Sequence, residues 1–224
     1  VNDSIFQSKY TSASNTQHLA YCFHSVEGYS RISSYQGTGA AGNFVVTGFE
    51  PAFLMIRRTD SGDNWLIFDN KRNTDNPRNL ALVPNSSAAE AVGNLGNGIS
   101  FNTNGFEVVS TDTGVNASNG SYIFMAFAQD PDNTPATEAN SFEAKTYTGT
   151  GSTQSITLSN GMKPDFTWIK QKSGGASHSL QDTVRGAGQS KNIYSDNTAS
   201  EGTYGQYGYL SAFNTDGFTV VQGS

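Results

Sequence analysis

Residues 48–57 read GFEPAFLMIR, and residues 161–170 read GMKPDFTWIK. In each segment a turn glycine is followed three residues later by a proline and then by aromatic and aliphatic side chains. Proline is tolerated at the first residue of a strand, where no ladder hydrogen bond depends on its nitrogen. Phe53, Met55 and Arg57 alternate with the residues between them, which is the period of a β-strand. We therefore expect a strand to begin near each proline.

The two segments belong to a longer internal repeat. Residues 35–39 recur as 147–151, residues 69–72 as 182–185, and residues 101–106 as 213–218. The order is the same in both copies, and the offset stays at 112 or 113 residues. Matching blocks in one order indicate duplication. The chain is therefore predicted to be a tandem copy of a unit of roughly 110 residues, a typical size for a β-sandwich domain.

The composition favours an all-β protein. Of the 224 residues, 14% are charged and 12% are aromatic, and 24 are glycine. The aromatic content argues against disorder, and the residue usage does not suit a coiled coil or collagen. Asn104-Gly105 and Asp216-Gly217 predict tight hairpin turns. We expect two tandem antiparallel β-sandwich modules of a concanavalin-like jelly-roll type.

The module boundaries follow from the repeat. The first module is predicted over residues 1–130, a proline-containing linker over 131–139, and the second module over 140–224. The first module continues into an apolar strand at residues 122–128, whereas the second stops soon after Phe218 and lacks that strand. Residues 19–23, LAYCF, resemble the missing strand in character. We hypothesise that residues 18–24 fill the gap, in the same chain or by strand addition between subunits of a fibre. The alternative explanation for the missing strand is that the chain was truncated or that it continues beyond residue 224.

Charge and cysteine content exclude several functions. The net charge is −6 and no basic cluster is longer than Arg57-Arg58, so we expect no nucleic-acid partner. No apolar run reaches the ~18 residues that a membrane span needs. The single Cys22 rules out an internal disulfide, and its apolar neighbours predict that it is buried. We expect no cofactor; calcium in the acidic loops at 60–63 and 130–133 is the alternative.

Several motifs, above all in the first repeat, resemble a known family. They look like a β-sandwich module of phage tail and tail-fibre-like virion proteins and comprise residues 21–30, 47–56, Trp65, 69–72, 85–90, 104–106 and 116–128. That module is similar to concanavalin A-like lectin/glucanase sandwiches. The resemblance implies a virion adhesion or structural role, and it brings no catalytic residue to this chain.

The best polar candidates recur in both repeats. Asp69 with Arg72, and Asp182 with Arg185, could bind a sugar or a carboxylate, because an arginine fork and a carboxylate acceptor suit such groups. The simpler interpretation is an ion pair that fixes a loop after a strand. We favour it, because a pair that sets the architecture should survive duplication in both copies.

The aromatic candidates, unlike the polar pairs, do not recur at equivalent positions of the two repeats. Trp65 follows Asp63-Asn64 and is either a platform for a sugar ring or part of the sandwich core. Trp168 alternates with Phe166 and is expected in the core. Tyr204 and Tyr207 lie in a glycine-rich segment that suits either a contact surface or a hairpin over the core edge. His178 lies four residues before Asp182, where a loop hydrogen bond is the favoured interpretation.

These observations favour a protein that is not an enzyme. The closely spaced acids of a glucanase, Glu-x-Asp-x-x-Glu, and the Gly-x-Ser-x-Gly elbow are both absent from the sequence. We expect a structural and attachment protein of a virion or an extracellular surface that self-associates or joins other fibre subunits and binds surface glycan. A fibre scaffold without ligand and a carbohydrate-binding or polysaccharide-active module are the alternatives.

Overall fold

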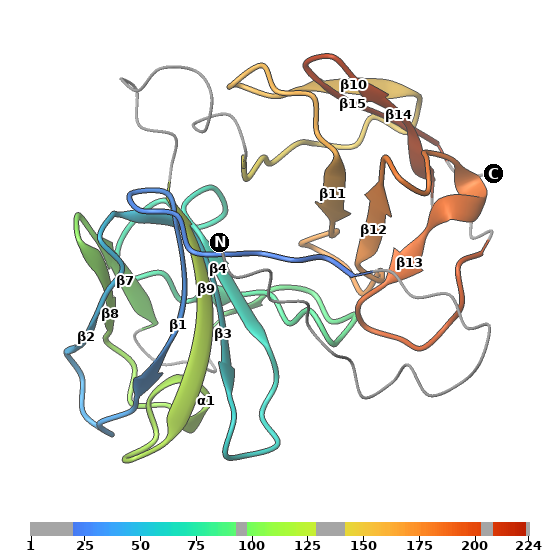
Figure 1. Ribbon diagram of the computed structural model, residues 1–224. Helices are drawn as coiled ribbons and strands as arrows, with labels where there is room; N and C mark the ends of the chain where they lie inside the picture. The colour runs from blue at the N-terminus through green and yellow to red at the C-terminus, as the bar shows by residue number, and fades with distance from the viewer. Residues whose placement is uncertain (1–19, 93–97, 129–141, 203–207, 223–224) are drawn as a thin grey trace.

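The computed structural model describes residues 20–92, 98–128, 142–202 and 208–222. These residues form an all-β fold of antiparallel sheets, as the sequence predicts (Figure 1). Helical structure in the described ranges is limited to α1 (Thr113–Asn116) and a 3-10 turn, η1 (Gln189–Lys191). No helix in the described part of the chain is long and apolar enough to cross a membrane.

The first repeat is built from two main sheets. A four-stranded sheet has the order β1-β9-β3-β4, and a three-stranded sheet has the order β2-β8-β7. The strands are β1 (Ser30–Gln36), β2 (Asn43–Val46), β3 (Pro51–Arg58), β4 (Leu66–Asp69), β7 (Ile99–Asn102), β8 (Gly105–Val108) and β9 (Ser121–Ala128), with a short pair β5 (Leu80–Ala81) and β6 (Ala91–Val92).

The two sheets enclose one apolar core. Leu54 of β3 and Phe124 of β9 belong to the same buried cluster as Phe106 and Val108 of β8. The rings of Phe106 and Phe124 meet edge to face, with centroids 5.2 Å apart. Each large side chain removed from water in this way stabilises the fold by about 1.5–3 kcal/mol. The first repeat is thus two sheets held face to face across a shared core.

The second repeat pairs its strands in the same register. Its sheets have the orders β11-β12-β13 and β10-β15-β14 and comprise β10 (Gln154–Thr157), β11 (Phe166–Ile169), β12 (Ser179–Asp182), β13 (Ile193–Tyr194), β14 (Tyr209–Asn214) and β15 (Gly217–Val221).

Two strand pairs show the match directly. Phe53 faces Asp69 across β3 and β4, and Phe166 faces Asp182 across β11 and β12. The hairpin partners Phe101 and Phe106 likewise correspond to Phe213 and Phe218. The duplication seen in the sequence therefore extends to the pairing of individual residues.

The second repeat lacks the counterparts of β1 and β9 in the described residues. In the first repeat β3 lies between β4 and β9, whereas β11 has only β12 as a neighbour. The prediction that residues 18–24 fill this gap within the chain is wrong for the described residues 20–24, which form no strand. The predicted linker, residues 131–139, lies outside the described residues.

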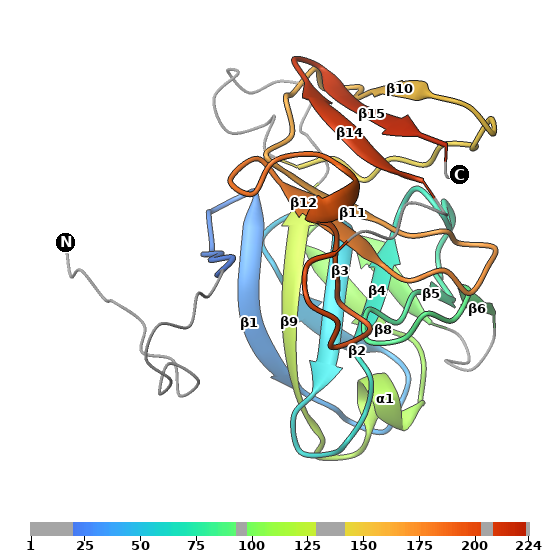
Figure 2. The same cartoon turned by 90° about the vertical axis from the view of Figure 1, so that its right-hand side faces the viewer.

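The two repeats contact each other through loops. The segment between β5 and β6 meets the second repeat, where Ser195 Oγ donates to the carbonyl of Pro84 and Glu90 N donates to the carbonyl of Lys172. The segment that precedes β1 runs from the first repeat towards β12 (Figures 1 and 2). There Tyr21 packs on Phe166 with ring centroids 4.7 Å apart. Cys22 is exposed in this segment, contrary to the prediction, because the contacts with the two repeats are made by the adjacent Tyr21 and Phe23.

Candidate functional site

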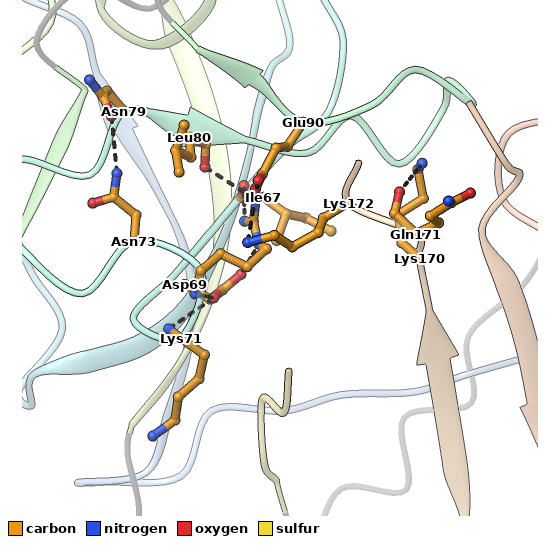
Figure 3. A network of polar contacts seen from close by, with 11 residues as sticks. Ile67, Asp69, Lys71, Asn73, Asn79, Leu80, Glu90, Lys170, Gln171 and Lys172 are labelled. Atoms are coloured by element: carbon orange, nitrogen blue, oxygen red, sulfur yellow. Dashed lines mark hydrogen bonds and ion pairs between the residues drawn. The ribbon is translucent and has the colours of Figure 1, made fainter. Parts of the chain in front are cut away.

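Asp69 and Arg72 form a buried ion pair at the end of β4. Arg72 Nε donates to Asp69 Oδ2 at 2.5 Å, and the two side chains are 6% and 9% exposed. The other Asp69 oxygen accepts from the backbone N–H groups of Lys71 and Arg72, which closes the turn after the strand. Figure 3 shows these contacts around the carboxylate.

The rest of the Arg72 guanidinium reaches across neighbouring strands. It donates to the carbonyls of Ile67 and Leu80 and to Glu90 Oε2. Glu90 in turn lies 3.5 Å from Lys172 Nζ of the second repeat (Figure 3). A guanidinium satisfied in this way by protein acceptors joins β4, β5 and the following loop.

The second repeat contains the same network. Arg185 Nε donates to Asp182 Oδ2 at 2.6 Å, and its other nitrogens donate to the carbonyls of Leu180 and Lys191. Glu201 takes the place of Glu90, 3.8 Å from Arg185. Since the network is repeated and internally paired, it supports the interpretation that these residues fix the loop.

Tyr21 adds a contact that is specific to the second network. Its hydroxyl donates to Asp182 Oδ2 at 2.7 Å. Burial and this hydrogen bond raise the pKa of Tyr21 to about 12. Burial alone would raise the pKa of Asp182, but the hydrogen bonds from Tyr21 and Arg185 lower it below its usual range. Asp182 therefore holds both the loop of its own repeat and the segment that precedes β1.

Trp65 lies in a different, more open environment. Its ring is half-buried, and the Arg57 guanidinium lies over it at 5.4 Å from the centroid. Asn85 Oδ1 accepts from the backbone N–H of Trp65, and Asn85 Nδ2 donates to Asn64 Oδ1. Both asparagines are exposed. We call Arg57, Asn64, Trp65 and Asn85 the Trp65 cluster.

A comparison with protein families finds one family that matches both repeats. The family model described as "Domain of unknown function (DUF7483)" matches residues 2–131 and 137–224. The chain belongs to the DUF7483 family. The break between the two matched stretches falls at the predicted linker, and each stretch contains one Asp–Arg–Glu network. No curated protein and no solved structure matches the chain.

The second DUF7483 repeat has His178 at the position of Trp65, and there the side chain joins the two repeats. His178 is 1% exposed, its Nδ1 accepts from Trp168 Nε1 at 2.8 Å, and its Nε2 lies 3.1 Å from the carbonyl of Val83. The predicted hydrogen bond to Asp182 is wrong, because that carboxylate is bound by Tyr21 and Arg185.

Trp168 is only half-buried, so the prediction of a core position is also wrong. The buried residue of β11 is Thr167, which precedes Trp168 and whose side chain points to the opposite face of the strand. Leu54, the counterpart of Thr167 in the first DUF7483 repeat, faces the core. Trp168 therefore lies on the outer face of the sheet, beside His178.

The remaining sequence candidates are not gathered into a site. Tyr204 and Tyr207 lie outside the described residues. Asp60 and Asp63 of the acidic loop pair with Arg58, and no group of three or more metal-ligating side chains occurs among the residues described here. An open depression of about 500 Å³ lies beside β1 and β2, lined by residues that include Glu27, Arg31 and Thr47, and none of the predicted site residues lines it.

The sequence pointed to Trp65 and the adjacent Asn64, but not to Arg57 and Asn85, which complete the Trp65 cluster. Arg57 lies beside Trp65 because the β3–β4 pairing places Ile56 opposite Leu66, one position from both residues. That register follows from the alternation in β3 and β4. Asn85 approaches from a loop 20 residues away, and no local pattern places it there.

Proposed function

We propose that this chain is a non-enzymatic structural and attachment protein of a virion appendage that binds surface glycan at the Trp65 cluster. The observation that carries the proposal is the half-buried Trp65 ring beside two exposed amides. A sugar ring offers an apolar face for stacking and hydroxyls for the amides and the guanidinium.

Arg57 strengthens this assignment. No carboxylate forms an ion pair with Arg57 within the described ranges, so its guanidinium, which lies over the Trp65 ring, is available to a ligand. Arginine suits ligands that carry carboxylate groups, because its fork can bind both oxygens. Acidic glycans are therefore the class that fits the Trp65 cluster best.

The carboxylates of the two networks support a role without catalysis. Asp69 and Glu90 share Arg72, and Asp182 and Glu201 share Arg185. A hydrolase needs two carboxyl groups that face a sugar between them. Here each pair of carboxylates shares one arginine, which suits a structural role better than a catalytic one.

A glycan array with the full chain tests the proposal. We expect binding to acidic glycans and a loss of at least about tenfold in affinity for Trp65→Ala, the size of effect that corresponds to about 1.4 kcal/mol. Val184→Ala, at an exposed position of the second repeat, is the matched control and should bind as the natural chain does. Unchanged binding by Trp65→Ala would remove the Trp65 cluster from the site.

Two further outcomes separate the alternatives. Release of reducing sugar from a polysaccharide panel would show an enzyme and contradict the proposal. Assembly into fibres without binding to any glycan would favour the scaffold without ligand, for which the repeated, internally satisfied networks are the supporting observation.

A further inference from the structure

The loop that carries Asn85, residues 82–90 between β5 and β6, also contacts the second repeat. The two residues before Asn85 each accept a hydrogen bond from that repeat. His178 Nε2 lies 3.1 Å from the carbonyl oxygen of Val83, and Ser195 Oγ donates to the carbonyl of Pro84. The second repeat therefore holds the backbone at the two positions that lead into Asn85.

The orientation of His178 is fixed by its partners. Its Nδ1 accepts from Trp168 Nε1 at 2.8 Å, so the proton of the neutral ring is on Nε2 and is donated to Val83. The backbone N–H of His178 donates to Asp196, the residue after Ser195. The ring is 1% exposed. The donors to the two carbonyls of the loop are thus joined to each other in a buried contact.

Asn85 connects the loop to the site itself. Its Oδ1 accepts from the backbone N–H of Trp65 at 3.1 Å, and its Nδ2 donates to Asn64 Oδ1 at 2.8 Å. The side chain is exposed. An exposed side chain loses rotamer freedom when a ligand binds, and this loss lowers affinity unless the side chain is already held in place. A backbone fixed immediately before Asn85 places its amide before a ligand arrives.

A third contact with the second repeat lies at the far end of the same loop. Glu90 N donates to the carbonyl of Lys172, and Glu90 Oε1 lies 3.5 Å from Lys172 Nζ (Figure 3). Glu90 also pairs with Arg72 of its own repeat, which holds this end of the loop independently of Lys172. The contacts next to Asn85 are therefore the ones that set its position.

We propose that His178 and Ser195 of the second repeat are positioning residues for the glycan site of the first. They act through the backbone of the loop and keep the Asn85 amide against Trp65. This inference rests on the proposed function and adds the second repeat to it: the ligand contacts the first repeat, and the geometry of its site depends on both. His178 is the counterpart of Trp65, so equivalent positions of the two repeats serve one site in different ways.

Hydrogen exchange at the Trp65 amide reports the position of Asn85 without a ligand, because this N–H donates to Asn85 Oδ1. We expect its protection to fall at least about fivefold in His178→Ala and in Ser195→Ala, while the amides of β9 keep theirs. Ser195 is only half-buried, so its variant should unfold at nearly the same midpoint as the natural chain. Unchanged protection of the Trp65 amide in both variants would overturn the proposal.

Two further variants serve as controls. His178→Gln should restore the protection, since a glutamine amide can accept from Trp168 and donate to Val83. Lys172→Ala removes an ion pair between the same loop and the same repeat, five residues beyond Asn85, and should leave the Trp65 amide protected. An equal loss for Lys172→Ala would mean that His178 and Ser195 have no particular role in positioning Asn85.

The strongest-binding acidic glycan of the array tests whether this positioning affects binding. We expect Asn85→Ala and Ser195→Ala each to lower affinity about fivefold to tenfold, and the double variant to bind no more weakly than Asn85→Ala. Additive losses, or full affinity in Ser195→Ala, would overturn the proposal. If the natural chain bound no acidic glycan, the proposed function would be wrong, and the Trp65 amide would decide the positioning of Asn85 by itself.

Discussion

The Arg72 guanidinium makes four hydrogen bonds, two to carboxylates and two to backbone carbonyls. Its side chain is 6% exposed, so its removal leaves Asp69 and Glu90 with little access to water. Breaking a buried ion pair from one side costs about 3–5 kcal/mol. We therefore expect Arg72→Met to lower the free energy of unfolding by about that amount, measured by urea denaturation.

Lys71→Met is the control for this prediction. Lys71 is the adjacent residue, its side chain is exposed, and only its backbone contacts Asp69. We expect its unfolding midpoint to match that of the natural chain. A small effect for Arg72→Met would mean that the pair does not hold the loop, and the ligand-binding interpretation of Asp69 and Arg72 would gain support.

His178 makes the contact between repeats sensitive to acid. Burial and the nearby Lys170 hold the pKa of His178 below its ordinary value. Between the folded-state pKa and the ordinary value of about 6.5, the unfolded chain binds more protons than the folded chain. The stabilisation is therefore complete above about pH 6.5 and is lost as the pH falls towards the folded-state pKa.

Thermal unfolding between about pH 5 and pH 8 measures this effect. We expect the midpoint of the natural chain to fall on the acid side. His178→Gln should remove most of that slope, since a glutamine amide can accept from Trp168 and donate to Val83 without titrating. Equal slopes in the two proteins would assign the acid sensitivity to other groups.

The sequence predicts the role of a single residue best where the same residue occurs at the same place in both repeats. The presence of an Asp–Arg pair in both copies predicts a structural role, and the two networks support that interpretation. The prediction for Trp168 is wrong because alternation gives the period of a strand and not the face that becomes covered. The prediction for Cys22 is wrong because an apolar stretch does not show which of its side chains make the contacts. The position of His178 depends on Val83, 95 residues away, and no local rule reaches that far.

At the scale of the element, the strands were the predictable part. Alternation and the turns Asn104-Gly105 and Asp216-Gly217 agree with the hairpins β7–β8 and β14–β15. The helix α1 was not predicted, because four residues carry no helical period. Its start depends on Asp112, whose side chain accepts from the backbone of Gly114.

Gly37 is the position where an element depends most on one small residue. Gly37→Ala places a methyl group against the carbonyl of Ala117, so the segment that leads into β9 must move. Overpacking of this kind costs about 1–3 kcal/mol. Chemical denaturation should show that loss for Gly37→Ala and almost none for Gly149→Ala, whose surroundings are open. Similar losses at both positions would mean that the two glycines are equally packed.

At the scale of the whole molecule, the two repeats exchange contacts through the segments that precede them. Tyr21, ahead of the first repeat, packs on Phe166 of the second. Phe142, at the start of the second, packs on Phe53 of the first, and Phe53 and Phe166 are counterparts. The sequence could not reveal this exchange, because each contact joins residues that are distant along the chain, and Tyr21 and Phe142 lie outside the repeated blocks.

This exchange makes Tyr21 the main link between the segment that precedes β1 and the second repeat. Tyr21→Ala removes both the ring contact with Phe166 and the hydrogen bond to Asp182, whereas Tyr21→Phe removes only the hydrogen bond. A fluorophore on Cys22, the single cysteine and an exposed one, reports the motion of this segment. We expect its anisotropy to fall strongly for Tyr21→Ala and slightly for Tyr21→Phe.

The same probe tests the electrostatics of the contact. The pKa of Tyr21 is raised from its ordinary value near 10 to about 12, so the folded chain keeps a proton that the unfolded chain releases. The contact is then at full strength below about pH 10 and is lost as the pH rises towards about 12. In Tyr21→Phe the anisotropy should not change over that range, because no phenol titrates at residue 21. An alkaline fall of equal size in Tyr21→Phe would show that the segment is released by a different group and that the hydroxyl of Tyr21 does not hold the repeats together.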